Sequence, residues 1–240
     1  MEKMKIFSKK DVLQIYNSDC LDVFPTLDSE SIDFLICDPP YECSKTTITR
    51  NSLKDLCSNF GKWDKFFTDW VEPSYRVLKP NSGMVVFVPA TRFETLVDVC
   101  SSVGFEYVQP WFWHRTNPVP TFRRGLQWSV EHMIYFVKGI HKLNIENHGK
   151  CHNLFNYPTP SGKIRFHPTQ KPIGLLKDIV CYVSDVGDLI LDCFSGSGTT
   201  GLAALSMGRR YIGIEREKEY FDKSVKLFKH RLKNDLFTGD

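Results

Sequence analysis

The chain has 240 residues, with 42% hydrophobic and 25% charged side chains, and its formal net charge is +3. These values fit one large globular domain or two small ones, and the mild basic excess permits a nucleic-acid partner without requiring one. No apolar run approaches the roughly 18 residues needed to cross a bilayer, and the first residues lack the apolar core of a secretory signal. We therefore expect a cytoplasmic protein without a membrane partner. The eight cysteines include no C-x-x-C pair, so no metal site is expected.

Apolar runs and turn residues predict an alternation of strands and helices along the first half of the chain. Thr91 and Glu94 match a capping box at the start of one helix, and Gly104 is suited to end it. In the preceding segment, residues 65–78, the apolar spacing is helical, and Pro73 is expected to interrupt that helix. The predicted elements are strands at 12–19, 31–38 and 84–89, helices at 65–78 and 91–104, and a turn at 79–83.

The second half of the chain continues this alternation after an irregular interruption. Residues 116–129 are rich in proline, arginine and aromatic side chains, and residues 139–166 are polar and predict a loop or a small insertion. The predicted elements are strands at 105–115, 130–139, 188–194 and 209–217, and helices at 174–185, 196–208 and 219–233. The alternation predicts an α/β fold with a Rossmann-like, doubly wound and mostly parallel sheet in a single domain, residues 1–240. The strands at 105–115 and 130–139 can pair as an antiparallel edge of this sheet.

The predicted strand at 31–38 ends in the sequence DPPY, which is Asp38, Pro39, Pro40 and Tyr41. Proline cannot donate to a strand ladder, so the two prolines explain why the strand stops. They do not explain the carboxylate and the phenol, which come to lie on a rigid turn at the carboxyl end of a strand. Ligands of open α/β sheets bind at that edge, so the turn is a candidate functional site.

A second candidate site lies where the strand at 188–194 runs into the sequence SGSGTTG. Gly196 and Gly198 allow close approach of the backbone to a ligand, and the following helix points its amide dipole at that ligand. A phosphate loop of the Walker type needs a lysine that is absent here. A nucleoside-containing cofactor remains, and Glu215 at the end of the next strand is placed to hold ribose hydroxyls. The plain alternative is an ordinary turn with a surface glutamate.

With its three motifs in this order, the chain resembles the amino-group DNA methyltransferases that use S-adenosylmethionine. The motifs are DPPY at 38–41, HPTQKP at 167–172 and DCFSGSGTT at 192–200. The catalytic motif precedes the glycine motif by about 150 residues, which resembles the beta class of that family. The resemblance extends from Asp19 to the last helix.

This resemblance implies a set of functional residues. Asp38 to Tyr41 are the implied catalytic residues, Glu215 takes the ribose hydroxyls, and Asp19 lies near the cofactor adenine. HPTQKP is the implied closing segment, although a helix entry at Pro172 and a surface Lys171 are plain alternatives. The residues implied for the S-adenosylmethionine site are Asp19, Cys20, Asp38, His167, Thr169, Lys171, Asp192, Phe194, Ser195, Gly196, Ser197, Gly198, Thr199 and Glu215.

An exocyclic amine on a base is a poor nucleophile because its lone pair is delocalised into the ring. Asp38 can accept from one N–H, the carbonyl of Pro39 can accept from the other, and Tyr41 can stack on the base. The base must flip out of the duplex to reach them. Trp63 is a candidate to receive it, although core packing is the favoured interpretation of that side chain. In the family an aspartate at the first motif position goes mostly with adenine N6 and a serine with cytosine N4, so adenine is the predicted target and cytosine N4 the alternative.

Two segments are predicted to face the DNA. Residues 42–62 follow the catalytic turn and carry Lys45 and Arg50, while residues 114–166 are the predicted inserted target-recognition region, ahead of a cofactor-binding half at 167–240. Arginine can contact phosphate or read guanine, and phosphate contact is the more frequent role. Plain surface loops are the alternative. The predicted contacts are Lys45, Arg50, His114, Arg115, Arg123 and Arg124.

The implied partner is double-stranded DNA in a bacterial or phage-encoded, nucleoid-associated setting. A homodimer and a cognate restriction endonuclease are further hypotheses. Methylation of RNA or of a protein amide is disfavoured, because such relatives usually begin the motif with asparagine and carry the glycine motif first. A DNA-binding module that has lost catalysis is disfavoured by the intact motifs.

Overall fold

The computed structural model describes residues 5–9, 11–40, 60–118, 126–146, 152–161 and 170–235. Several residues predicted from sequence to be functional lie outside these ranges: Tyr41, Lys45, Arg50, Arg123, Arg124, His167 and Thr169. No helix in the described ranges is long and apolar enough to span a membrane.

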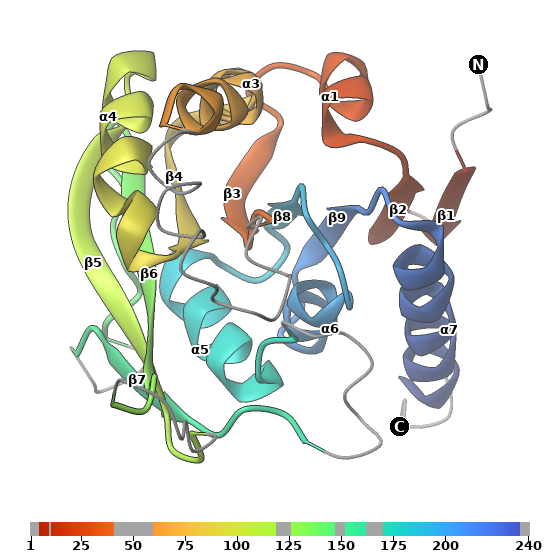
Figure 1. Ribbon diagram of the computed structural model, residues 1–240. Coiled ribbons are helices and arrows are strands. Elements are labelled where there is room, and N and C mark those ends of the chain that lie inside the picture. Colours follow the sequence, from red (N-terminus) through yellow and green to blue (C-terminus); the bar gives the residue numbers. More distant parts are fainter. Residues whose placement is uncertain are drawn as a thin grey trace.

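Nine strands of the described residues form one sheet in the order β1-β2-β9-β8-β3-β4-β6-β5-β7 (Figure 1). The strands are β1 (Lys5–Lys9), β2 (Leu13–Asn17), β3 (Ile32–Cys37), β4 (Leu78–Val88), β5 (Glu106–Arg115), β6 (Val130–Lys138), β7 (Leu154–Tyr157), β8 (Leu189–Asp192) and β9 (Arg210–Ile214). The run from β2 to β4 is parallel, and β6 and β5 continue it as an antiparallel edge. The predicted fold class is therefore confirmed.

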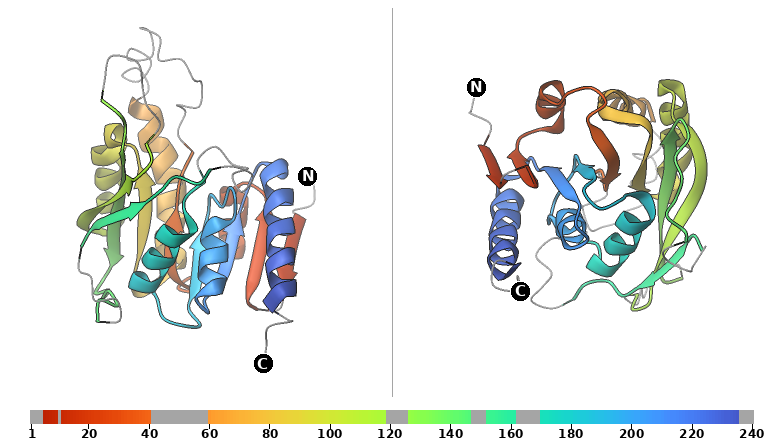
Figure 2. Two further views of the ribbon diagram at one scale, coloured as in Figure 1. Left: turned by 90° about the horizontal axis from the view of Figure 1, so that it is seen from below. Right: turned by 180° about the vertical axis from the view of Figure 1, so that it is seen from behind.

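Helices cover both faces of the sheet, as two further views also show (Figure 2). On one face lie α1 (Cys20–Val23), α3 (Phe60–Val77) and α4 (Phe93–Val103), with the 3-10 turns η1 (Phe24–Thr26) and η3 (Ala90–Arg92). On the other lie α5 (Ile173–Val183), α6 (Thr199–Ser206) and α7 (Lys218–Asp235).

The central strand β3 shows why its sequence is almost continuously apolar. Successive side chains of a strand point to opposite faces. Leu35 and Cys37 pack in the core beneath α3 and α4, while Phe34 and Ile36 pack in the core beneath α5 and α6. All four are buried, as expected for a parallel strand covered by helices on both faces.

Two of three local predictions differ from the structure. Pro73 lies inside α3 without ending it, because packing of buried Phe67 and Trp70 offsets one missing hydrogen bond. Thr91 is not the N-cap of α4, because the turn η3 precedes the helix and Arg92 takes that position without a side-chain capping bond. Gly104 ends α4 with φ of 116°, as predicted.

The predicted turn at 79–83 lies within β4, as an irregularity of that strand. The pairing of β3 with β4 shifts from Ile32–Leu78 to Phe34–Gly83, and Asn81 takes a left-handed φ of 59°. The turn residues thus produce a bulge while the chain keeps its place in the sheet.

Two short strands were not predicted. β1 contains only two apolar residues, and β7 lies within the polar stretch 139–166 that was predicted as loop. Each occupies an edge of the sheet, where pairing to one neighbour suffices and apolar periodicity is weak.

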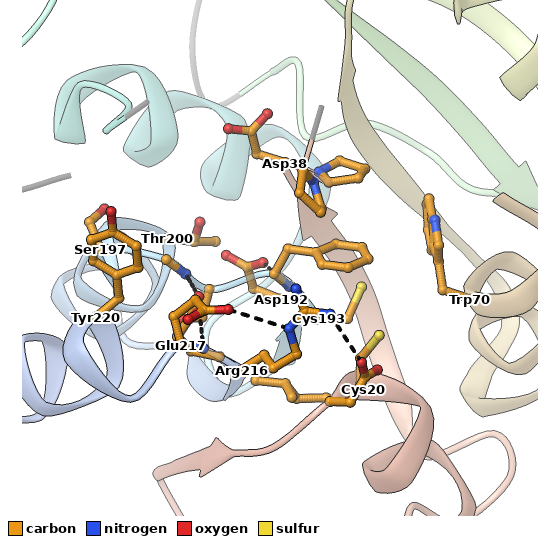
Figure 3. A pocket seen from close by; sticks show the side chains of 18 of the residues that line it. Cys20, Asp38, Trp70, Asp192, Cys193, Ser197, Thr200, Arg216, Glu217 and Tyr220 are labelled. Carbon is orange, nitrogen blue, oxygen red and sulfur yellow. Dashed lines mark hydrogen bonds and ion pairs between the residues drawn. The ribbon is translucent and has the colours of Figure 1, made fainter. Parts of the chain in front are cut away.

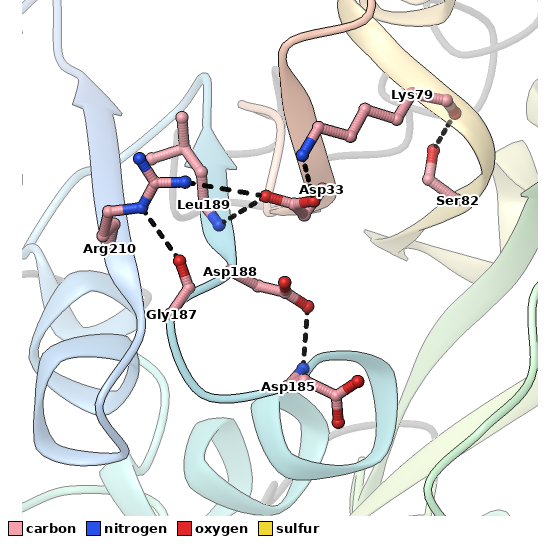
Figure 4. A network of polar contacts seen from close by, with 8 residues as sticks. All are labelled: Asp33, Lys79, Ser82, Asp185, Gly187, Asp188, Leu189 and Arg210. Carbon is pink, nitrogen blue, oxygen red and sulfur yellow. Dashed lines mark hydrogen bonds and ion pairs between the residues drawn. The ribbon is translucent and has the colours of Figure 1, made fainter.

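Asp33 joins three neighbouring strands at the amino edge of the parallel run (Figure 4). Its carboxylate accepts from the backbone N–H of Leu189 at 2.8 Å and from Lys79 Nζ at 2.6 Å, and Arg210 lies 4.0 Å away. The contact joins the starts of β3, β4 and β8.

Replacing Asp33 with alanine should lower the free energy of unfolding by about 1–3 kcal/mol, because the Leu189 N–H loses its acceptor. Urea denaturation measures the difference. Asp33→Asn, which keeps an acceptor for that N–H, should lose less, and an Asp33→Ala protein as stable as the wild type would contradict the assignment.

Candidate active site

A pocket of about 660 Å³ opens at the carboxyl edge of the parallel strands (Figure 3). The ends of β3, β8 and β9 and the turns that follow them supply much of its wall, with further residues from the end of β2 and from α3. The lining residues are Ser18, Asp19, Cys20, Leu21, Asp38, Pro39, Pro40, Phe66, Asp69, Trp70, Lys171, Leu176, Asp192, Cys193, Phe194, Ser195, Gly196, Ser197, Thr199, Thr200, Ile214, Glu215, Arg216, Glu217 and Tyr220. Both sequence motifs predicted to be functional therefore meet at one cavity.

The turn from β8 to α6 depends on its glycines. Gly196 and Gly198 both have positive φ, at 50° and 72°. A Cβ atom on Gly198 would lie 2.8 Å from the Phe228 ring and 3.0 Å from Ser224. Gly198 is the N-cap of α6 and is not among the lining residues, so its role is to shape the turn that brings Gly196 and Ser197 to the wall.

Glu215 lies at the end of β9 and is held by two backbone amides. Its Oε2 accepts from Gly196 N at 2.7 Å, and its Oε1 accepts from Glu217 N at 2.7 Å. Burial raises the pKa of the carboxyl, and these two hydrogen bonds oppose that effect. The two amides fix the orientation of the carboxylate at the pocket wall, where sequence predicted it.

Asp192, the last residue of β8, is buried beneath the same turn. Its Oδ1 accepts from Phe194 N at 3.1 Å, and the Thr200 side chain also hydrogen-bonds to the carboxylate. Burial raises the pKa of the carboxyl from 3.8 to about 7. The pocket thus contains a carboxyl whose charge changes near neutral pH.

Asp38 follows β3 directly and lies at the rim of the cavity in Figure 3. Its Oδ2 accepts from Lys171 Nζ at 2.6 Å. Its Oδ1 is buried, and within the described residues it has no hydrogen-bond partner. Trp70 Nε1 is likewise a buried polar atom on the pocket wall with no partner in that part of the chain. One carboxylate oxygen and one indole N–H of pocket-lining residues are therefore left unsatisfied by the described residues.

Asp19 and Cys20 also line the pocket. Asp19 caps α1 by accepting from Leu21 N at 3.0 Å, and its other oxygen lies 3.6 Å from Arg216 Nη1. Burial raises the pKa of the Cys20 thiol, which keeps it protonated at neutral pH. These contacts explain the local structure and leave cofactor binding by the two residues as a prediction.

The two described residues with predicted DNA contacts are both tied to neighbouring strands. His114 Nδ1 lies 2.8 Å from Asn156 Oδ1 on β7. The Arg115 guanidinium pairs with Glu131 on β6 and lies 5.3 Å over the Trp113 ring. DNA contact by these side chains stays a prediction.

Sequence reasoning identified Phe194 but not Phe66 and Trp70, two other aromatic residues of this pocket wall. Trp70 packs edge-on against Phe194 with ring centroids 5.6 Å apart, and Phe66 lies 6.2 Å from the same ring. Trp63, the aromatic residue that was considered from sequence, is buried in the core with Arg92 over its ring. The helical spacing of Trp63, Phe66 and Trp70 was the available signal, but it did not indicate which end of the face meets the pocket. No cluster of metal-binding side chains occurs among the residues described.

Comparison with known proteins identifies the family. The family model described as DNA methylase matches residues 32–226. Among curated relatives, Type II methyltransferase M2.MboI of Moraxella bovis is 32% identical over 89% of this chain and 86% of its own length. Type II methyltransferase M2.DpnII of Streptococcus pneumoniae is 29% identical over 98% of this chain and 95% of its own length. The chain therefore belongs to the DNA methylase family, and the predicted resemblance is confirmed.

Solved structures agree with this assignment. The SAM complex of M1.HpyAVI has a TM-score of 0.70 and 29% sequence identity, covering 90% of this chain and 98% of that one. The PvuII DNA methyltransferase, described as cytosine-N4-specific, has a TM-score of 0.76 at 22% identity and covers 89% and 85% of the two chains. The second comparison shows a shared fold.

The buried Asp192 predicts a defined dependence of stability on pH. Its carboxyl has a pKa of 3.8 when unfolded and about 7 when folded, so its protonated form stabilises the fold. That stability is fully present below about pH 4 and is lost as the pH rises through about 7. Asp192→Asn keeps an acceptor for Phe194 N and cannot ionise.

The stability of Asp192→Asn relative to the wild type should therefore rise between about pH 4 and pH 8. Urea denaturation of both proteins across this range measures the difference. A difference that does not change with pH would show that Asp192 keeps an ordinary pKa.

Proposed function

We propose that this protein is a sequence-specific DNA methyltransferase that transfers a methyl group from S-adenosylmethionine to N6 of adenine in double-stranded DNA. The observation that carries the proposal is the buried Oδ1 of Asp38 in the pocket wall, which has no hydrogen-bond partner among the described residues. Family membership supports methylation of an amino group on a DNA base.

The pocket fits S-adenosylmethionine in its size and in the groups that line it. A volume of about 660 Å³ suits a nucleoside-sized ligand. The fixed Glu215 carboxylate can accept from ribose hydroxyls, Asp192 offers a carboxyl to a positively charged group, and the Phe194 and Trp70 rings supply apolar wall. The bound cofactor supplies a methyl group on a positively charged sulfur, which leaves as a neutral thioether.

Asp38 can make the exocyclic amine of a flipped base more nucleophilic. Its Oδ1 can accept one N–H, and the carbonyl of Pro39, which is held by the rigid Pro-Pro pair, can accept the other. Both contacts favour localisation of the nitrogen lone pair towards the incoming carbon. Tyr41, which lies outside the described residues, is the proposed stacking partner of the base.

Asp38 at the first position of the motif supports adenine N6 as the target. The alternative is cytosine N4, and the fold does not distinguish the two, because the PvuII enzyme with its cytosine-N4 description shares it. The base is therefore assigned from the motif.

Residues 42–62 and 114–166 are the proposed DNA-facing segments, and residues 167–240 contribute most of the cofactor site. The pocket is also lined by residues before 167, among them Asp19 and Trp70, so the cofactor site is shared by both halves. The type II designation of relatives supports a cognate endonuclease in the bacterial cytoplasm. A homodimer is a further part of the proposal.

The function is tested with tritium-labelled S-adenosylmethionine and unmethylated bacterial genomic DNA, followed by digestion and nucleoside chromatography. Label in N6-methyladenosine is the expected result. Label in N4-methylcytosine would overturn the base assignment and keep the enzyme class. No label in any nucleoside would overturn the proposed function.

Asp38→Ala should lower kcat by at least about a hundredfold, because the target amine loses its acceptor. The affinity for S-adenosylmethionine, measured by calorimetry, should stay within about threefold of the wild type, well below the tenfold change that corresponds to about 1.4 kcal/mol. Thermal unfolding checks that the variant is folded. Retention of wild-type kcat would remove Asp38 from the mechanism.

Glu215→Gln should weaken S-adenosylmethionine binding by about tenfold to a hundredfold, since a hydrogen bond to a charged group is worth about 1.5–3 kcal/mol. Calorimetric titration measures the change. Glu219→Gln on α7 is a matched control, because that side chain is 75% exposed and pairs with Lys223. Equal affinity of the Glu215 variant and the wild type would contradict the assigned ribose contact.

A further inference from the structure

Lys171 was predicted as a cofactor contact, but the structure directs its ammonium group at two carboxylates. Its Nζ lies 2.6 Å from Asp38 Oδ2 and 3.2 Å from Glu131 Oε2, and 4.7 Å from the centroid of the Phe87 ring. The Lys171 side chain is only 9% exposed. The ammonium group is therefore buried between two carboxylates, and Asp38 is the nearer of the two.

Glu131 connects this ion pair to the antiparallel edge of the sheet. Its Oε2 faces Lys171, and its Oε1 pairs with Arg115, whose backbone N–H donates to the carbonyl of Ser129 at 2.7 Å. Two cations and two carboxylates thus alternate from the end of β5 to the end of β3, and their formal charges cancel. The chain of ion pairs ends where the segment predicted to recognise the target begins.

We propose that Lys171, held in place by Glu131, is a positioning residue that fixes the orientation of Asp38 for the target amine. This proposal rests on the proposed function. An aspartate carboxylate can turn about its terminal bond and exchange its two oxygens. The Lys171 contact engages Oδ2 and leaves Oδ1, which has no partner in the described part of the chain, for the incoming N–H.

Packing alone does not account for this lysine. An ion pair in a buried position is often no more stabilising than apolar side chains of similar volume, because both charges lose their hydration. The ring of Phe87 beside the lysine would accept an apolar side chain equally well. A role in orienting a reactive carboxylate explains why a charge lies here.

The test compares Lys171→Met with Lys79→Met. Methionine keeps an apolar stem against Phe87 and removes the charge. Lys79 is the matched control, because its Nζ also lies 2.6 Å from an aspartate, Asp33, but at the opposite end of β3. Methyl transfer, S-adenosylmethionine affinity and thermal unfolding are measured for both variants and the wild type.

Lys171→Met should lower kcat by about tenfold to a hundredfold, the usual result of a misplaced reacting group, with unchanged affinity for S-adenosylmethionine. Lys79→Met should lose thermal stability and keep the wild-type kcat. A wild-type kcat in Lys171→Met would overturn the inference while the proposed function stands. Cofactor affinity that falls as much as kcat would also overturn it, in favour of a cofactor contact. A wild-type protein without transferase activity would overturn both.

Glu131→Gln tests the second carboxylate beside Lys171 without removing the lysine. It keeps the inference testable if the Lys171 variant does not fold. It should lower kcat by a smaller factor than Lys171→Met does and leave the affinity for S-adenosylmethionine unchanged. In the Lys171→Met background the same change should have no further effect on kcat, because the two residues act through one contact. Additive losses would overturn the role of Glu131.

Discussion

The ion pair between Asp38 and Lys171 is the contact on which the site depends. It joins residues 133 positions apart, one at the end of β3 and the other just before α5. Because both charges are largely buried, each requires the other, and loss of either leaves an uncompensated charge. The same contact distinguishes the two carboxylate oxygens, because Oδ2 accepts from Lys171 and Oδ1 has no partner within the residues that the structure describes. The DPPY turn, the segment before α5 and, through Glu131, the antiparallel edge of the sheet are thereby joined at the pocket.

The parallel sheet places these groups together. Strands β3, β8 and β9 run in one direction, so the residues that follow them, Asp38, Phe194 and Glu215, meet at one edge although they are distant in sequence. At the other end of the same strands Asp33 ties β3, β4 and β8 together. Apolar cores cover both faces of the sheet, so the polar contacts of these strands lie at their amino and carboxyl ends.

The parts of the fold and site that could be predicted are those encoded locally. DPPY and the glycine turn each combine unusual backbone requirements with a polar residue at a strand end, so short segments identify them. The strands β1 and β7 carry too few apolar residues to be predicted, and α4 begins later than its capping-box pattern indicates because the turn η3 precedes it. Glu131 carries no local signal, and the helical spacing of Trp70 does not show which part of its helix face meets the pocket. Their positions arise because the fold brings a β6 carboxylate to Lys171 and the Phe66–Trp70 part of α3 to the cavity.

The most direct measurement is a crystal structure of this protein with S-adenosylmethionine bound. We expect the ribose hydroxyls to hydrogen-bond to Glu215 and the sulfonium methyl group to face Asp38, with Lys171 still on Oδ2. A cofactor whose ribose lies away from Glu215, or whose methyl group points away from Asp38, would contradict the assignment of the pocket and of the catalytic carboxylate.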